Sequence, residues 1–374
     1  MVLTLHGQAD DVRNPIYDRR GLIAGELEMK RPERVLAVSV KLEGRVTMSV
    51  AGVGAKMMRT MEHQAVLWAK EEGSQRRCPG TLLFSLRLPS KFVEDDETWK
   101  LPPSFEPDFI NVNTMFVRST YILSISLRKL VNYRLVSWTK SKMYNVLVEH
   151  RPQNRPTRPV PLFDSICSSV KSLPDDWVQL VSRMEVTPGS RLRPVQCQFL
   201  VPSNPTYCLS DAIPFHIQLS SSLGTIRELF PPSSQFLQPR QTQDKKQKAM
   251  RRGVAMRVYI AREIMVAIRG KKVYRTVAIG SGTVKAIPPT DLGRISVPPE
   301  DVCLEWEGEV KCWDQVTCGG FNVGCLNVKD YIVLALTPPL SKTYPELVEL
   351  QIAHPVKFVT EPWLENGTMH PRDY

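Results

Sequence analysis

The stretch that decides the fold is Val35-Leu-Ala-Val-Ser-Val-Lys-Leu-Glu-Gly-Arg-Val-Thr-Met-Ser-Val50. Apolar side chains occupy its even positions, apart from Gly44, and most of their neighbours are small, polar or charged. Alternation of period two is typical of a β-strand with one face on a core and one in water. A parallel strand buried on both faces would be apolar throughout. We therefore predict antiparallel structure, with a bend or bulge at Gly44.

Similar alternation recurs in both halves of the chain. The further strands that it predicts lie at residues 2–5, 22–29, 82–88, 121–127 and 145–149, then at 196–201, 213–219, 258–268, 302–306, 331–336 and 347–352. Many short strands with turns between them are typical of β-sandwiches. The predicted fold is all-β, with two tandem antiparallel immunoglobulin-like β-sandwich domains.

The predicted domain limits follow from a change in composition. Residues 1–150 form the first sandwich, residues 151–185 a Pro-rich linker with a short helix, residues 186–362 the second sandwich and residues 363–374 a tail. The helix is predicted near the domain junction, because apolar residues recur there at i, i+3, i+4 and i+7: Trp177, Leu180, Val181 and Met184. A proline and two acidic residues, Pro174, Asp175 and Asp176, precede them and suit the start of a helix.

The net charge of +11 is unevenly distributed along the chain. The segment from Pro239 to Arg252 carries six basic residues and one acidic residue, which accounts for the whole excess of the C-terminal half. These basic residues could contact an anionic membrane surface or an acidic partner, or belong to a solvated loop; they are Arg240, Lys245, Lys246, Lys248, Arg251 and Arg252. The segment lacks interleaved aromatic residues, so no nucleic-acid partner is expected.

Sequence motifs give no support to an enzyme. The six histidines are scattered, and no GxSxG, P-loop or HExxH spacing occurs. The eight cysteines include no CxxC pair, so we expect reduced, structural thiols and no metal or cofactor. No signal sequence and no apolar stretch of about 18 residues is visible, which favours a cytoplasmic protein.

Four segments together resemble the arrestin superfamily, in particular its fungal α-arrestin-like branch. They are Gly21-Leu-Ile-Ala-Gly-Glu-Leu-Glu-Met29 with Val38-Ser-Val-Lys-Leu-Glu-Gly44, Cys78-Pro-Gly-Thr-Leu-Leu-Phe-Ser-Leu-Arg-Leu-Pro89 with Leu101-Pro-Pro-Ser-Phe-Glu106, Tyr207-Cys-Leu-Ser-Asp-Ala-Ile-Pro-Phe-His-Ile-Gln-Leu219, and His354-Pro-Val-Lys-Phe-Val359. Their order and spacing, which span nearly the whole chain, carry the resemblance.

The resemblance implies a non-catalytic trafficking adaptor, recruited from the cytoplasm to the plasma membrane or endosomes. Such an adaptor binds cytosolic segments of integral-membrane transporters or receptors and links them to ubiquitination or endocytosis. The resemblance also leaves open a scaffold subunit of a retromer-like endosomal sorting coat, which needs no ubiquitin ligase. The absence of a PPxY motif favours the scaffold, whereas the motif match favours the adaptor.

A HECT-type ubiquitin ligase is a further candidate partner of such an adaptor. α-Arrestins dock into WW domains through PPxY motifs, and the nearest match in this chain is Pro102-Pro103-Ser104-Phe105, which lacks the phenol hydroxyl. Pro102, Pro103 and Phe105 are therefore candidate WW-binding residues. The alternative is a proline-ordered loop inside the first sandwich.

Overall fold

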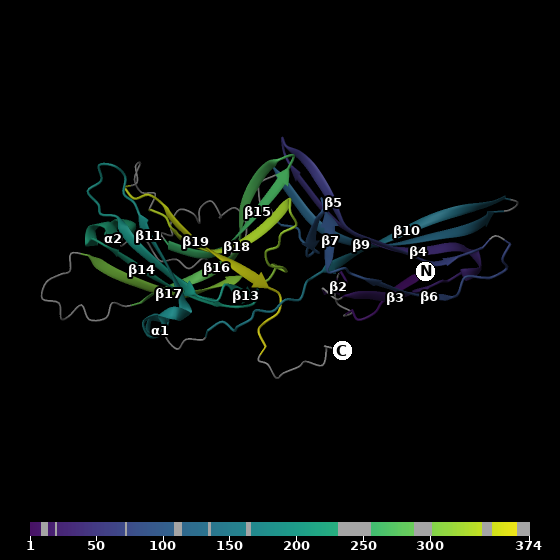
Figure 1. The fold of residues 1–374 in the computed structure, drawn as a ribbon, viewed down its shortest axis with the longest axis horizontal. Coiled ribbons are helices and arrows are strands. Elements are labelled where there is room, and N and C mark those ends of the chain that lie inside the picture. Colours follow the sequence, from purple (N-terminus) through teal and green to yellow (C-terminus); the bar gives the residue numbers. More distant parts are fainter. Residues whose placement is uncertain are drawn as a thin grey trace. The chain divides into compact units, whose positions relative to one another are not determined.

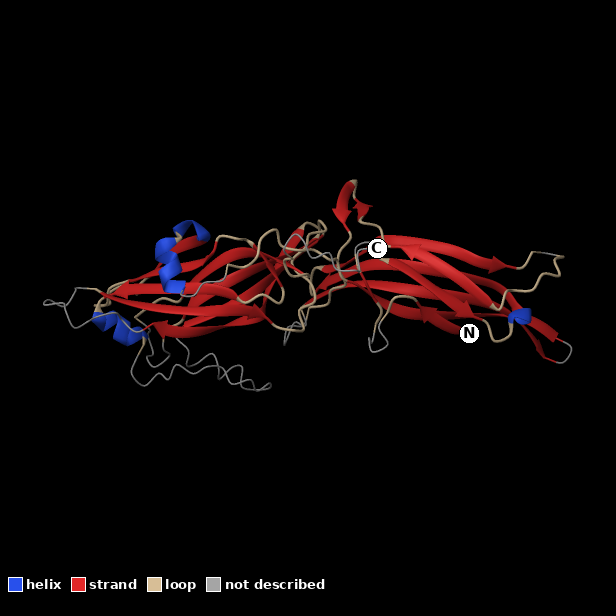
Figure 2. Ribbon diagram, turned by 90° about the horizontal axis from the view of Figure 1, so that it is seen from below, coloured by secondary structure: helices blue, strands red, loops and turns tan. Residues whose placement is uncertain are grey.

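The structure is a computed structural model that describes residues 1–8, 14–18, 21–71, 73–107, 114–133, 136–161, 166–230, 256–287, 301–338 and 346–364. The fold is all-β, as predicted: strands dominate, and the helices α1 (Ile166–Ser172) and α2 (Leu223–Leu229) are short (Figure 2). The chain divides into two compact units. The first unit comprises Met1–Asn154, Ile264–Arg275 and Phe321–Val328; the second comprises Arg155–Glu263, Thr276–Gly320 and Lys329–Tyr374.

The first unit contains a three-stranded sheet, a five-stranded sheet and a hairpin. The three-stranded sheet has the order β1-β3-β6, formed by Val2–Leu5, Leu22–Glu28 and Thr81–Arg87. The five-stranded sheet has the order β2-β10-β9-β4-β5, formed by Ile16–Tyr17, Val136–His150, Met115–Tyr133, Val35–Val50 and Gly54–Ala69. The hairpin joins β7 (Lys91–Glu94) to β8 (Glu97–Lys100).

Strand β4 has the structure that its alternation predicts. It pairs antiparallel with β9 on one side and with β5 on the other, and its even residues from Val38 to Val50 are buried. The predicted irregularity at Gly44 is present, but the extra residue is Thr60 of β5: the β4–β5 register shifts between Gly44 and Arg45, whereas the β4–β9 register does not shift there. A Cβ atom on Gly44 would lie 2.6 Å from the Thr60 Oγ1 and 2.7 Å from a ring carbon of Tyr121, so this position requires glycine.

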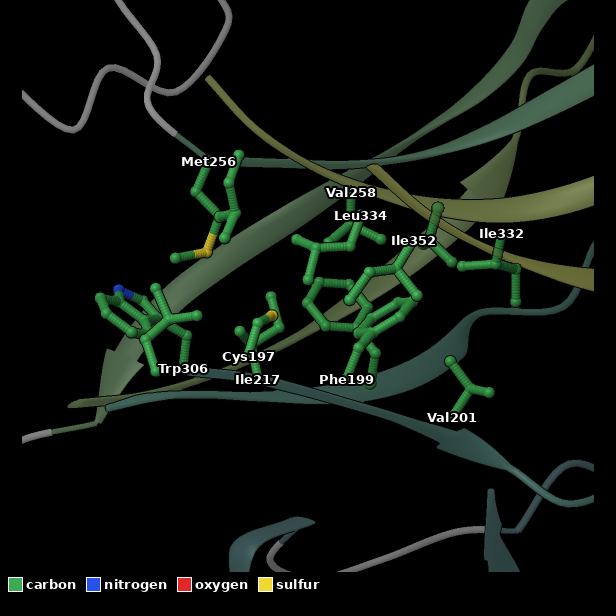
Figure 3. Packing of buried hydrophobic residues seen from close by; sticks show 14 of the residues in the cluster. Cys197, Phe199, Val201, Ile217, Met256, Val258, Trp306, Ile332, Leu334 and Ile352 are labelled. Carbon is green, nitrogen blue, oxygen red and sulfur yellow. The ribbon is translucent and has the colours of Figure 1, made fainter. Parts of the chain in front are cut away.

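The second unit contains most of a nine-stranded sheet with the order β11-β12-β14-β17-β16-β15-β18-β19-β13, of which one end each of β15, β16 and β18 belongs to the first unit. In chain order, β11 to β19 are Trp177–Met184, Val195–Pro202, Thr206–Cys208, Ile213–Ser221, Met256–Ile268, Lys271–Ile287, Val302–Cys312, Leu326–Leu336 and Leu350–Val359. Figure 3 shows the core that this sheet encloses, where side chains such as Phe199 of β12 point toward side chains such as Leu334 of β18. The apolar positions of the alternating segments thus meet in one cluster.

The predicted helix over Trp177–Met184 is wrong. A 3₁₀ turn at Pro174–Asp176 leads directly into strand β11, which pairs with β12 along its whole length. Within a segment of only eight residues, this pattern of apolar positions fits a short helix and a twisted strand equally well. Pairing with a neighbouring strand decides between the two. A helix does occur between residues 151 and 185, but it is α1, which ends before the turn.

Candidate functional site

Strand β10 is an edge of the five-stranded sheet over most of its length. It pairs with β9 from Val136 to Val148 without a register shift, and β9 and β10 run side by side as one long hairpin (Figure 1). On its other side, among the described residues, it pairs with β2 alone, at Glu149 and His150. No strand that the structure describes pairs with that side between Trp138 and Val148.

The backbone groups that face away from β9 belong to the odd-numbered residues of β10. The N–H of Glu149 donates to the carbonyl of Pro15 at 2.9 Å, on the side of β2. Alternate residues of a strand direct their N–H and C=O groups to the same side. The outward donors and acceptors of the open part therefore belong to Thr139, Ser141, Met143, Asn145 and Leu147.

Large apolar side chains are exposed along this edge. Met143 is 67% exposed, and smaller fractions of the surfaces of Trp138, Tyr144 and Leu147 are also open to solvent. By contrast, four residues of β9 that share a face with Tyr144 are fully buried: Tyr121, Leu123, Ile125 and Leu127. The core of the first unit thus reaches Val148, whereas β10 is exposed on both faces from Trp138 to Asn145.

The charge of the hairpin is entirely positive. Residues 1–114 carry 16 basic and 16 acidic residues, whereas the stretch from Met115 to Val148 carries six basic and no acidic residues. Of the basic residues, Arg118 pairs with Glu106 at 3.1 Å. Lys140 lies directly opposite Lys129 in the register, and like charges in this arrangement are unfavourable.

Four further cations of the hairpin lie among the described residues. Within the described part of the chain, no ion pair joins Arg128, Lys129, Lys140 or Lys142 to a carboxylate. Lys140 and Lys142 are exposed, and Lys129 is half-buried. The hairpin therefore offers positive charge, apolar surface and free backbone groups together.

The closed end of the edge is fixed by β2. The Asn14 side-chain amide donates to the Glu149 carboxylate at 3.1 Å, and His150 pairs with Tyr17 in the register. Burial lowers the pKa of His150 to about 4, and its Nδ1 has no hydrogen-bond partner among the described residues. Its ring packs edge-on against Tyr121 at a centroid distance of 5.4 Å.

The site residues that the sequence suggested have two different outcomes. Arg240, Lys245, Lys246, Lys248, Arg251 and Arg252 lie outside the described residues. Pro102, Pro103 and Phe105 are buried. The Pro102 carbonyl accepts a hydrogen bond from the Tyr121 hydroxyl at 2.5 Å, and Phe105 exchanges backbone hydrogen bonds with Ser119. A WW domain needs exposed proline rings, and this loop does not present them.

A buried ion pair in the second unit breaks the apolar alternation of its strand. Arg262 of β15 donates to both carboxylate oxygens of Asp330 of β18, at 2.7 and 3.1 Å. The guanidinium also donates to the Cys318 carbonyl, and the carboxylate accepts from the Gly320 N–H. Each charge thus has hydrogen bonds to its partner and to the backbone, which is the condition for burying it.

The structure shows no metal-binding cluster among the residues that it describes. No group of three or more His, Cys, Asp and Glu side chains there could hold a metal ion. Free cysteines occur at positions 78, 197, 208, 303, 312, 318 and 325. No described helix is long and apolar enough to cross a membrane.

Comparison with known proteins finds no family model and no curated protein that matches this chain. The hairpin formed by β9 and β10 is therefore the candidate site on geometry alone. Our sequence analysis missed it, although a signal was present. The stretch from Met115 to Val148 lacks acidic residues, and the charge of the N-terminal half is concentrated there.

Proposed function

We propose that this protein is a non-catalytic adaptor that binds extended segments of partner proteins along strand β10. The observation that carries the proposal is the open, unbulged edge from Thr139 to Leu147. Edge strands with free N–H and C=O groups pair readily with another chain, and natural proteins usually protect them. Here the edge is long, apolar side chains flank it, and the chain's own β2 already pairs with its end.

The class of adaptor that we propose is arrestin-like, with two β-sandwich domains. Its partners are cytosolic segments of integral-membrane transporters or receptors, which it links to ubiquitination or endocytosis at the plasma membrane or endosomes. The all-β fold and the division into two compact units support this proposal. In strand addition the main chain supplies the affinity and alternate side chains supply the specificity, so one edge can serve several partners.

Hydrogen exchange on the full chain tests the proposal. The probes are synthetic peptides that cover the cytosolic segments of membrane transporters and receptors. A bound segment should slow exchange at the outward amides of Thr139, Ser141, Met143, Asn145 and Leu147. If no peptide protects these amides, or if protection falls only on other strands, the proposal is wrong.

Two substitutions at Met143 separate backbone pairing from side-chain contact. Because the Met143 N–H points away from β9, Met143→Pro removes one outward donor and leaves the β9 ladder in place. We expect it to weaken peptide binding at least tenfold, equivalent to about 1.4 kcal/mol. Met143→Ala keeps the N–H and should bind within about threefold of the parent chain, a difference below 1 kcal/mol. Equal loss in both variants would point to side-chain contact instead.

A further inference from the structure

We infer that the segment bound by β10 alternates acidic and apolar side chains. This inference rests on the proposed function and adds the chemistry of the occupant. A strand that pairs with β10 projects alternate side chains to the two faces of the sheet, beside the side chains that β10 projects there. The two faces of β10 differ in chemistry, so they select different residues.

The face shared with the core of the first unit selects acidic residues. On this face β10 presents Lys140 and Lys142, between the exposed Trp138 and Tyr144. Lys129 of β9 lies opposite Lys140 on the same face. Carboxylates that alternate along a bound strand would lie beside these ammonium groups and offset their mutual repulsion.

The opposite face of β10 selects apolar residues. Met143 and Leu147 project there, separated by the uncharged Asn145, and both are exposed. On β9 the same face carries the exposed Leu130, opposite Thr139, and the exposed Arg128, opposite Ser141. The cation on this face therefore belongs to β9 and not to the edge strand that a bound segment would adjoin. Apolar side chains of the bound strand would cover this surface, so its residues beside Met143 and Leu147 are aliphatic or aromatic.

The length of the site follows from the open part of the edge. Thr139 to Leu147 spans nine residues, and β2 blocks further pairing at Glu149. The occupant is therefore an extended segment of about nine residues with period-two alternation. A disordered acidic chain without that alternation would place carboxylates against Met143, and so would bind more weakly.

Four nine-residue peptides of equal length test the inference by fluorescence anisotropy with the full chain. The first alternates Glu and Val; the second contains the same residues with the glutamates consecutive; the third alternates Lys and Val; the fourth alternates Thr and Val. We expect the Glu/Val alternation to bind about tenfold more tightly than either the consecutive arrangement or the Thr/Val peptide. The Lys/Val peptide should bind weakest.

A charge-reversed variant provides the matched test. In Lys140→Glu/Lys142→Glu, the order of the Glu/Val and Lys/Val peptides should invert, while the Thr/Val peptide binds as before. This inversion also shows that the variant is folded. Equal binding of the alternating and consecutive glutamate peptides would overturn the inference and indicate general electrostatic attraction. If the parent chain instead binds phosphatidylserine vesicles more tightly than any peptide, and the variant loses this binding, the inference is overturned in favour of a membrane surface.

The outcomes distinguish this inference from the proposed function. If the Thr/Val peptide protects the outward amides of β10 as well as the Glu/Val peptide does, strand addition stands and the acidic alternation is wrong. If no peptide protects them, both fail.

Discussion

The five-stranded sheet has two long edges, and they differ in almost every property that governs pairing. Strand β5 shows two register shifts against β4, whereas β10 shows none against β9. The cations of β5 have acidic partners: Lys56 lies 3.4 Å from Asp95, and Arg59 pairs with Glu62. Among the described residues, no ion pair joins the cations in the open part of β10 to a carboxylate, and the nearest acidic residue in the sequence, Glu149, pairs with Arg151 instead.

This difference shows how one sheet can protect one edge and leave the other available. Bulges and paired charges on an edge strand disfavour addition of a further chain. Strand β5 also contacts β6 and β7, which follow it in the chain. In the part of the chain that the structure describes, strand β10 has no bulge, no ion pair and no covering strand between Trp138 and Val148, so its edge is open to a further strand.

The largest expected effect is on stability and concerns Arg262, a buried cation that has an acidic partner, unlike the lysines of β10. Arg262→Met leaves the carboxylate of Asp330 buried without its guanidinium, so we expect the free energy of unfolding of the second unit to fall by about 3–5 kcal/mol. Urea denaturation measures this loss. Lys142→Met on β10 is the matched control and should change stability by less than about 0.5 kcal/mol.

The double variant Arg262→Met/Asp330→Leu completes this test. Replacing both charges with apolar residues removes the unpaired carboxylate, and much of the lost stability should return. If Arg262→Met alone costs less than about 1 kcal/mol, the ion pair is not needed to keep Asp330 buried.

The next effect concerns the pH dependence of the closed end of β10. The folded pKa of His150 is about 4, below the ordinary value of 6.5, because burial disfavours its charged form. Between these values the unfolded chain binds a proton that the folded chain does not. The contribution of His150 to the free energy of unfolding is therefore fully present above pH 6.5 and is lost as the pH falls, by about 3 kcal/mol down to pH 4.

His150→Leu removes this titration. Chemical denaturation of the first unit at pH 7 and pH 4.5 should show a smaller difference in the variant than in the parent chain. The same substitution at the exposed His63 of β5 controls for loss of an imidazole from the sheet. An unchanged difference in His150→Leu would show that other groups produce the acid sensitivity.

Gly44→Ala tests the bulge that distinguishes the β5 side of the sheet. The new Cβ would meet Thr60 and the ring of Tyr121 well inside van der Waals contact. We expect a loss of about 2–3 kcal/mol in the free energy of unfolding of the first unit. Gly80→Ala is the control, because nothing lies within 4 Å of the Cβ that it adds. A loss below about 0.5 kcal/mol would mean that the bulge can relax around a methyl group.

Much of the fold could be predicted from hydrophobic alternation, because each half-buried strand carries that pattern in its own residues. Strands β4, β6 and β14 are clear cases. Strand β5 was missed because an edge strand with polar side chains on both faces does not alternate. The Trp177–Met184 segment was misassigned because its strand character depends on β12, which lies further along the chain.

The candidate site could be predicted only in part. The excess of basic residues from Met115 to Val148 is present in the sequence. Whether this excess of basic residues marks a binding site depends on strand order. In a central strand the same charges would not lie beside free backbone groups. Order in a sheet is set by contacts between distant segments, such as the pairing of β2 with Glu149 and His150, and alternation carries no such information.

The smallest expected effect tests the comparison of the two edges most directly. Lys140→Thr removes one member of a like-charged pair, so the free energy of unfolding of the first unit should rise by about 0.5 kcal/mol. The same substitution at Lys56 of β5 removes a cation that pairs with Asp95, and stability should fall by a similar amount, about 0.5 kcal/mol. In 1 M salt, where charges are screened beyond about 3 Å, both differences should shrink. If both substitutions lower stability, the unpaired lysines of β10 are not a structural cost, and their repulsion would no longer favour an acidic partner.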